Sequence, residues 1–266
     1  MAALVCWPLC TPRCLGAWPS ASEMEWMLEF TGCSKKNDRA ILHDFDLPTL
    51  HAMKITRLLA IRHGETPWNV ETRIQGHTDI GLNEEGQWQA QQLAKALASE
   101  DIDAVYASDL SRAFSTAQAI ATPHQLNVTA LPGLRERHLG QFQGQTWAEI
   151  ETQHPEDAAR WRQREPDWTP QGGGESLVML HQRISNLAHD IASQHVGQHI
   201  VWVTHGGVLD ILYRMATGQT LQAPRTWGLR NTAINRLLWT PEGLQLVGWA
   251  DERHLDNIEA REENSA

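Results

Sequence analysis

Apolar residues along this chain form short unbroken runs that alternate with longer amphipathic segments. The runs at residues 58–61 and 200–203 are apolar on both faces, which is typical of strands buried in a parallel sheet. Residues 102–107 and 126–131 predict two further short strands. Between them, apolar spacings of three and four predict helices. These helices are expected at residues 83–99, 110–121, 175–194 and 208–217.

Turn residues and helix caps divide these elements. Asn83 is expected to cap the first helix, and Ser108 with Asp109 the second. Residues 147–164 carry scattered helical spacings without a regular period. Polar, glycine-containing stretches predict loops at residues 66–78, 134–144 and 171–174.

The last two predicted strands, at residues 233–240 and 244–250, flank a Pro-Glu-Gly turn and read as a hairpin. The order of elements is therefore an alternation of strands and helices followed by an antiparallel pair. It predicts an α/β fold, a three-layer sandwich with a mostly parallel central sheet.

Composition narrows the class of protein. The chain has 266 residues, of which 41% are hydrophobic, enough for one sizeable core. A formal net charge of −10 argues against a nucleic-acid partner held by a broad basic face. No apolar run approaches the ~20 residues that cross a bilayer, so we expect no membrane partner and a cytoplasmic protein. All cysteines precede Met53, which removes thiolate, disulfide and cysteine–metal chemistry from the rest of the chain.

Residues 1–52 differ from the rest in holding every cysteine and showing no repeating period. Two interpretations stay open: an atypical N-terminal extension, or a start of translation that really lies at Met53. Residues 53–258 are predicted to be the functional domain, and residues 259–266 a charged tail.

Two of the apolar runs end in the same dipeptide. Arg62-His63-Gly64 follows the first, and Thr204-His205-Gly206 follows the run at 200–203. The carboxyl ends of parallel strands are where α/β sheets place ligand sites, so we expect the two imidazoles to face each other. Neutral imidazole is a good nucleophile toward phosphorus and needs no metal for it.

Phosphoryl chemistry also needs cations and an acid, and the chain supplies both near the same edge. Arg62 adjoins His63, and Arg112 lies in the first turn of a predicted helix, so planar guanidiniums are available for phosphoryl oxygens. Glu136, on a loop, is the candidate to protonate a leaving alkoxide. Each residue alone has an ordinary structural explanation, and the argument rests on their combination.

This combination resembles a known family. Arg62-His63-Gly64-Glu65-Thr66, Ser108-Asp109-Leu110-Ser111-Arg112, Leu134-Arg135-Glu136, Gly174-Glu175-Ser176 and Thr204-His205-Gly206-Gly207 follow one another as in the histidine phosphatase superfamily, the phosphoglycerate mutase-like proteins. The resemblance spans roughly residues 54–250 and implies the phosphoglycerate mutase-like fold.

The resemblance also implies roles. His63 is implied as the phosphorylated nucleophile, with His205 beside it and Glu136 as general acid and base. The implied phosphate site is completed by Arg62, Asn69, Arg112 and Gly206. Candidate contacts to the rest of the substrate are Gln75, Gly76, Arg137 and Arg162, with Trp147 and Trp168. No metal is implied, and 2,3-bisphosphoglycerate would be required only by a mutase.

The family contains phosphatases and mutases, and several departures from the mutase pattern favour a phosphatase. Leu139, Trp147, Gln163 and Gly207 stand where mutases carry tyrosine, lysine, arginine and asparagine, and the segment between Gly144 and Gly174 is short for a mutase lid. The sequence therefore predicts a phosphomonoester hydrolase that acts through phosphohistidine on a small phosphorylated metabolite. The alternatives are a bisphosphoglycerate-dependent phosphoglycerate mutase and, third, a non-catalytic phosphate-ester binding protein. A homo-oligomer stays open.

Overall fold

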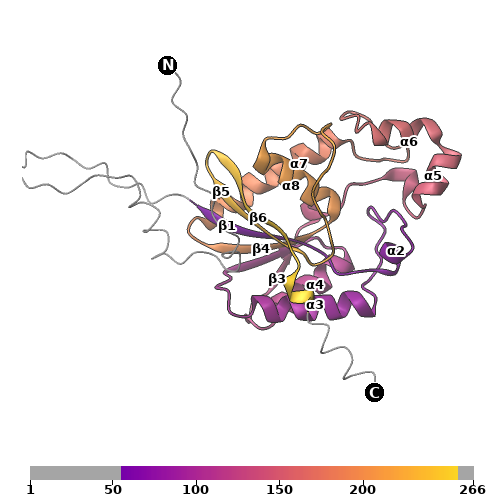
Figure 1. The fold of residues 1–266 in the computed structure, drawn as a ribbon. Helices are drawn as coiled ribbons and strands as arrows, with labels where there is room; N and C mark the ends of the chain where they lie inside the picture. Colours follow the sequence, from indigo (N-terminus) through magenta and orange to yellow (C-terminus); the bar gives the residue numbers. More distant parts are fainter. Residues whose placement is uncertain (1–54, 257–266) are drawn as a thin grey trace, which may run out of the picture. The chain divides into compact units, whose positions relative to one another are not determined.

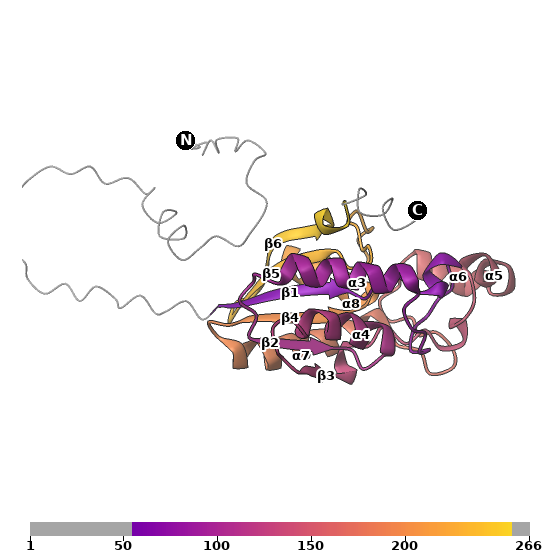
Figure 2. The same ribbon diagram turned by 90° about the horizontal axis from the view of Figure 1, so that it is seen from below.

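The computed structural model describes residues 55–256 (Figure 1), and its centre is a six-stranded sheet in the order β3-β2-β4-β1-β5-β6. Figure 2, which looks onto one face of the sheet, shows the strands in this order. Strands β3, β2, β4 and β1 are parallel, and β5 and β6 form an antiparallel hairpin beside β1. The strands are β1 (Thr56–Arg62), β2 (Ala104–Ala107), β3 (Val128–Ala130), β4 (His199–Thr204), β5 (Ile234–Thr240) and β6 (Gly243–Asp251).

Helices cover both faces of this sheet. Figure 1 shows α3 (Glu84–Leu97) and α4 (Ser111–Ala121) on one side and α7 (Leu177–Ala192) and α8 (Gly206–Thr217) on the other. The short helices α2 (Pro67–Val70), α5 (Trp147–Gln153) and α6 (Pro155–Arg162) lie beyond one end of the sheet. The predicted α/β three-layer fold is confirmed. Single 3₁₀ turns occur at η1 (Pro132–Leu134), η2 (Gly140–Phe142), η3 (Ser193–His195) and η4 (Arg253–Leu255).

The two apolar runs that opened the sequence argument are the buried centre of the sheet. Every residue of β4 is buried, and Leu58, Leu59, Ala60 and Ile61 of β1 are fully covered. One core cluster joins these strands to the apolar faces of α7 and α8. The strands carry β-branched and apolar residues without alternation because helices cover both faces.

The caps predicted for two helices can be compared with the structure, and one of the two predictions is confirmed. Asn83 caps α3 as predicted, since its side chain accepts a hydrogen bond from the Gly86 amide at 2.7 Å. The prediction that Ser108 and Asp109 cap α4 was wrong: the N-cap is Leu110, without a side-chain cap, and the Asp109 carboxylate instead pairs with an arginine side chain.

Two segments are more ordered than their sequence suggested. Residues 66–78, expected as loop, contain α2, whose first turn Thr66 and Asn69 cap reciprocally. Residues 147–164 form α5 and α6, with Pro155 opening the second helix. A small separate core of Phe142, Ile150, Ala158 and Trp168 holds this region together, which explains why no long helical period was visible.

Within residues 55–256, no helix combines the length and the apolar character that a bilayer crossing requires. The proposed extension at residues 1–52 and the tail at 259–266 lie outside the described residues.

Candidate active site

The two strand-end histidines meet as the sequence predicted. Arg62 pairs with Thr204 in the parallel register of β1 and β4, and the His63 amide donates to the Thr204 carbonyl at 2.9 Å. The imidazole centroids of His63 and His205 lie 5.1 Å apart, and the rings are tilted by 58°. Both side chains are buried.

The hydrogen bond of His63 fixes which of its nitrogens can react. Nδ1 lies 2.7 Å from the Gly64 carbonyl oxygen. A carbonyl only accepts, so Nδ1 carries the hydrogen and Nε2 keeps its lone pair. Burial, followed by the charges of Arg62 and Arg112, holds the pKa of His63 well below its usual range. At neutral pH the ring is therefore neutral, with a nucleophilic Nε2.

Two guanidiniums, one partly and one fully buried, act on the imidazoles. Arg112, fully buried on α4, donates from Nη1 to the Thr78 carbonyl and from Nη2 to the Gly76 carbonyl, each at 2.8 Å. Arg62 Nη1 donates to the Leu229 carbonyl at 2.6 Å. Burial lowers the pKa of both side chains, to about 10 for Arg112, so both remain cationic at neutral pH.

Several polar atoms of this cluster have no partner among residues 55–256. They are Nε of Arg62, Nε of Arg112 and both ring nitrogens of His205, and all are buried. Buried polar groups are nearly always hydrogen-bonded, so orphaned ones in one cluster indicate a ligand site. Cationic donors around a neutral imidazole fit an anion with several oxygens, such as a phosphoryl group.

The Glu136 carboxylate lies against the first turn of α8. Its Oε1 accepts from the Arg137 amide at 2.7 Å, and both oxygens lie 3.0 Å from the Gly207 amide nitrogen. A Cβ at residue 207 would come within 2.3 Å of Oε1. Glycine at this position therefore leaves room for the Glu136 side chain to reach the backbone amide at the start of α8.

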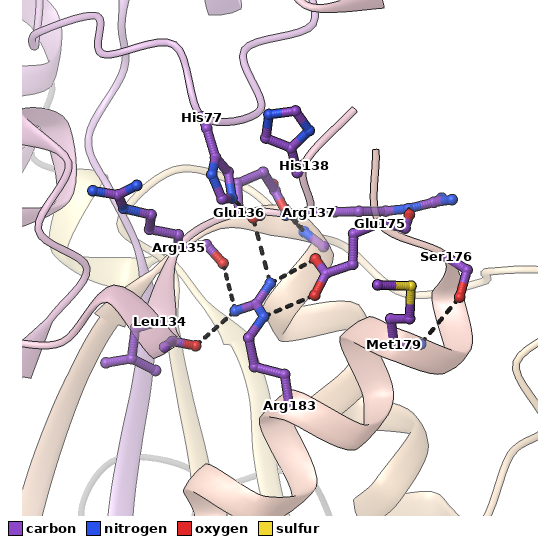
Figure 3. Close-up of polar contacts among 12 residues, drawn as sticks. His77, Leu134, Arg135, Glu136, Arg137, His138, Glu175, Ser176, Met179 and Arg183 are labelled. Carbon is purple, nitrogen blue, oxygen red and sulfur yellow. Dashed lines mark hydrogen bonds and ion pairs between the residues drawn. The ribbon is translucent and has the colours of Figure 1, made fainter. Parts of the chain in front are cut away.

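Figure 3 shows how the loop that carries Glu136 is held from below by Arg183 of α7. The Arg183 guanidinium binds both oxygens of Glu175, at 2.9 and 2.8 Å. It also donates to the carbonyls of Gly133 at 2.6 Å, Arg135 at 3.0 Å and Glu136 at 3.4 Å. One side chain thus fixes three peptide groups of the loop.

The same Glu136 carbonyl is held from the other side by His77. His77 Nε2 donates to it at 2.7 Å, and the His77 ring packs edge-on against His138 with centroids 4.7 Å apart. Burial lowers the pKa of His77, so this ring is neutral at neutral pH.

Three predicted residues are close to the cluster but contribute through the backbone or through neighbours. Asn69 Oδ1 accepts from the Thr66 amide and hydroxyl at 3.1 Å, and so holds α2 in place. Gly76 supplies the carbonyl that binds Arg112. Gln75 is buried, and its Oε1 has no partner within the described residues.

Two arginines predicted to contact the substrate are bound by other groups of the protein. Arg137 was expected at the substrate, but its guanidinium is buried and donates to the carbonyls of Glu175 at 2.6 Å and Trp168 at 3.3 Å. Arg162 projects from α6, where it pairs with Glu151 and lies over the Trp147 ring at 5.2 Å. Neither arginine lines the pocket described next.

A pocket of about 620 Å³ adjoins the cluster at Arg62. Arg62, Glu136, Gly206 and Gly207 line it. The remaining lining residues come from four other places in the chain: Glu65, Gln89 of α3, the loop residues Arg225, Leu229, Arg230 and Asn231, and Glu252 with Leu255 after β6.

The sequence analysis did not identify the part of the pocket lining that comes from residues 225–231, called here the outer wall. Residues 218–233 carry neither an apolar period nor a motif. The only available signal was position, since the segment follows a helix that starts at the second histidine. One residue in this segment contacts the backbone of His63: Asn231 Nδ2 donates to the His63 carbonyl at 2.8 Å. No group of three or more metal-ligating side chains suited to an ion occurs in residues 55–256.

This geometry agrees with comparisons to known proteins. The family described as the histidine phosphatase superfamily (branch 1) matches residues 58–252, and the chain belongs to this superfamily.

Among its relatives in Arabidopsis thaliana, phosphoglycerate mutase-like protein 4 is 40% identical, covering 75% of this chain and 86% of the relative. A metal-independent phosphoserine phosphatase from the same plant is 37% identical, covering 77% and 85%. A solved phosphoserine phosphatase from Entamoeba histolytica, in complex with phosphoserine, matches with a TM-score of 0.68 and 28% identity, covering 75% of this chain and 99% of that one.

The chain is thus an enzyme of phosphoryl transfer, a phosphatase for small phosphorylated metabolites, as its sequence predicted. Enzymes of this kind need no cofactor, and the name of the second relative states independence of metals.

Proposed function

We propose that the chain hydrolyses phosphate monoesters through a phosphohistidine formed on His63 Nε2. The observation that carries this proposal is the set of orphaned buried polar atoms on Arg62, Arg112 and His205 around a neutral imidazole. Phosphoryl transfer depends mainly on positioning and on neutralising the oxygens of the transferred group, and these side chains supply both.

In the first half-reaction, Nε2 attacks phosphorus while the ester P–O bond breaks. The phosphoryl oxygens are bound by Arg62, Arg112 and His205, and protonated Glu136 gives its proton to the leaving alkoxide. The Nδ1–H of His63 stays bonded to the Gly64 carbonyl, which stabilises the positive ring of the phosphohistidine.

In the second half-reaction, water attacks the phosphohistidine and the N–P bond breaks. The Glu136 carboxylate takes a proton from this water, which returns both residues to their starting states. Inorganic phosphate leaves through the pocket, where Glu136, Gly206 and Gly207 lie at the lining.

Water, not a bound product, is proposed as the acceptor. A mutase must close its site over the phosphohistidine while the product reorients. In the segment expected to form such a lid, Arg162 pairs with Glu151. Arg137, which precedes this segment, binds backbone carbonyls, so neither guanidinium is free for a glycerate carboxylate in this pocket.

We expect phosphate release from 3-phosphoglycerate to outpace formation of 2-phosphoglycerate, with no requirement for 2,3-bisphosphoglycerate. Both products are measured in one reaction, with and without the bisphosphate. EDTA is expected to leave the rates unchanged, because the charges on the phosphoryl oxygens are matched by side chains. Isomerisation that is many times faster than phosphate release, and depends on the bisphosphate, would show a mutase instead.

We further propose a functional domain at residues 53–258, action in the cytoplasm, and no nucleic-acid partner. The net charge of −10 supports the last point. Small phosphorylated acids are the first substrates to assay, because the relatives are named for phosphoserine and phosphoglycerate.

A further inference from the structure

Most charged side chains on the pocket wall have a partner within the described residues. Arg230 pairs with Glu252 at 3.2 Å, Glu65 accepts from the Asn83 side chain at 2.8 Å, and Glu136 accepts from backbone amides. Arg62 belongs to the phosphoryl site. Arg225 lines the same pocket, is exposed, and has no ion-pair or hydrogen-bond partner within residues 55–256.

The loop that carries Arg225 is held in place on its first side by two arginines. Arg214 of α8 donates to the carbonyls of Thr220 and, at 2.9 Å, Ala223. Arg164 donates to the carbonyl of Leu221 at 2.7 Å. These contacts fix the chain up to two residues before Arg225.

The residues that follow Arg225 are held by ring stacking at Trp227 and by a hydrogen bond from Arg62 of β1. Trp227 stacks on Tyr213, with ring centroids 4.0 Å apart and planes within 19°, and the Arg214 guanidinium lies over the Trp227 ring at 4.8 Å. Leu229 then accepts the hydrogen bond from Arg62. Arg225 therefore sits on a short span between anchored residues, so the position of its Cα is preorganised.

Arg225 and Arg62 line the same pocket, and the positive charge of Arg225 adds to the effect of burial in lowering the pKa of Arg62. Two cations on one pocket repel each other, and an anionic ligand between them relieves this repulsion. The phosphoryl group satisfies Arg62 and Arg112. A single unmatched guanidinium beyond them fits one further negative charge, and a planar carboxylate accepts guanidinium hydrogen bonds in bidentate geometry.

We propose that Arg225 recognises a carboxylate of the substrate, so that the enzyme acts on phosphate monoesters of small carboxylic acids. This inference rests on the proposed function, since it places the phosphoryl group at His63, beside the pocket that Arg225 lines. It assigns specificity to the loop between α8 and β5, apart from the residues that bind phosphate.

The test compares O-phosphoserine with O-phosphoethanolamine, which lacks only the carboxylate. Binding of each is measured by calorimetry in a His63→Ala background, with and without Arg225→Ala, and kcat/KM of each is measured with His63 intact. We expect a preference for O-phosphoserine that Arg225→Ala lowers roughly 10- to 100-fold, as for a hydrogen-bonded charge pair. Arg225→Lys should retain part of the preference for O-phosphoserine.

Arg253→Ala is the matched control, because Arg253 is an exposed arginine that pairs with Asp251 and does not line the pocket. Equal affinity of the parent for both ligands, or an equal loss for both in Arg225→Ala, would overturn the proposal. The binding measurement does not depend on turnover. An enzyme that prefers O-phosphoserine but releases no phosphate from either ester would refute the phosphatase proposal and leave this one standing.

A second inference follows from the contacts in Figure 3, which are independent of the pocket wall. We infer that Arg183 is a positioning residue for Glu136, again on the premise that Glu136 transfers the proton. Its guanidinium binds the carbonyls of Gly133, Arg135 and Glu136 and is itself oriented by both oxygens of Glu175. It makes no contact with the phosphoryl site.

Arg183→Lys keeps the charge but loses the planar fork that spans these groups. We expect turnover of an alkyl ester such as O-phosphoserine to fall roughly 10-fold or more, since small misplacements of catalytic groups are costly. Turnover of 4-nitrophenyl phosphate, whose leaving group needs no proton, should fall much less. Glu175→Gln weakens the ion pair that orients Arg183. This variant should likewise lose more activity on the alkyl ester than on 4-nitrophenyl phosphate.

Arg73→Lys serves as control, because Arg73 also combines an ion pair with a hydrogen bond to a carbonyl but does so away from this loop. In a Glu136→Gln background, Arg183→Lys should cause no further loss on the alkyl ester. Equal losses on both esters, or a full additional loss in that background, would show a general structural role. If the parent enzyme hydrolyses neither ester, the proposed function itself fails.

Discussion

Replacing His63 by alanine is expected to abolish turnover, with a loss on the order of 10⁴–10⁶-fold, the scale seen when a covalent nucleophile is removed. Nε2 of His63 is the atom proposed to receive the phosphoryl group, and neither Arg62 nor Arg112 can replace it, because guanidinium has no free lone pair at neutral pH. Acid-labile, base-stable phosphoenzyme should be trapped from the parent and be absent from the variant.

The fold of the variant must be checked separately, because the ring is buried and bonded to the Gly64 carbonyl. His63→Asn is a useful second variant, since its amide can donate to the same carbonyl without acting as nucleophile. His124→Ala is the control, because His124 is a partly buried histidine whose ring contacts the Leu97 carbonyl and not the site. This variant should retain turnover and phosphoenzyme. Wild-type rates in both His63 variants would refute the phosphohistidine mechanism.

Glu136→Gln should slow hydrolysis of alkyl phosphates by ~10²–10⁴-fold, the usual worth of general acid–base catalysis. The glutamine fills the same space beside Gly207 but cannot give a proton to an alkoxide. Nitrophenolate departs without a proton, so 4-nitrophenyl phosphate should lose much less. The measurement is kcat/KM across a series of esters ranked by leaving-group pKa, which should show a steeper dependence in the variant.

Glu71→Gln is the control for that series, because this carboxylate pairs with Arg73 outside the pocket. A uniform loss across all leaving groups in Glu136→Gln would mean that Glu136 supports the site structurally or acts only on the attacking water.

The centre of the site could be predicted from sequence because its position follows from strand ends. The apolar runs before His63 and His205 define parallel neighbours, and parallel neighbours bring their carboxyl ends to one edge. Arg112 was found for a similar reason, since it begins a helix that follows the next strand. Asn83 was identified as a cap because capping depends on a few adjacent residues.

The outer wall could not be predicted in the same way. Arg225 lies in a polar loop whose path is set by Arg164, Arg214 and Trp227, and these contacts join distant parts of the chain. Arg183 belonged to the polar side of an amphipathic helix, where an arginine is ordinarily exposed. For Arg137, its place in a motif suggested a contact with the substrate, and nothing in the sequence indicated that the carbonyls of Glu175 and Trp168 bind its guanidinium.

The position of β1 in the middle of the sheet affects how the enzyme loses activity. β1 is hydrogen-bonded to β4 on one side and β5 on the other, and the His63 amide extends this ladder. Strands of this kind open only with the whole domain, whereas peripheral loops open alone. Heat or denaturant should therefore erode substrate selectivity at the loop of Arg225 first, and the nucleophile should keep its orientation until global unfolding.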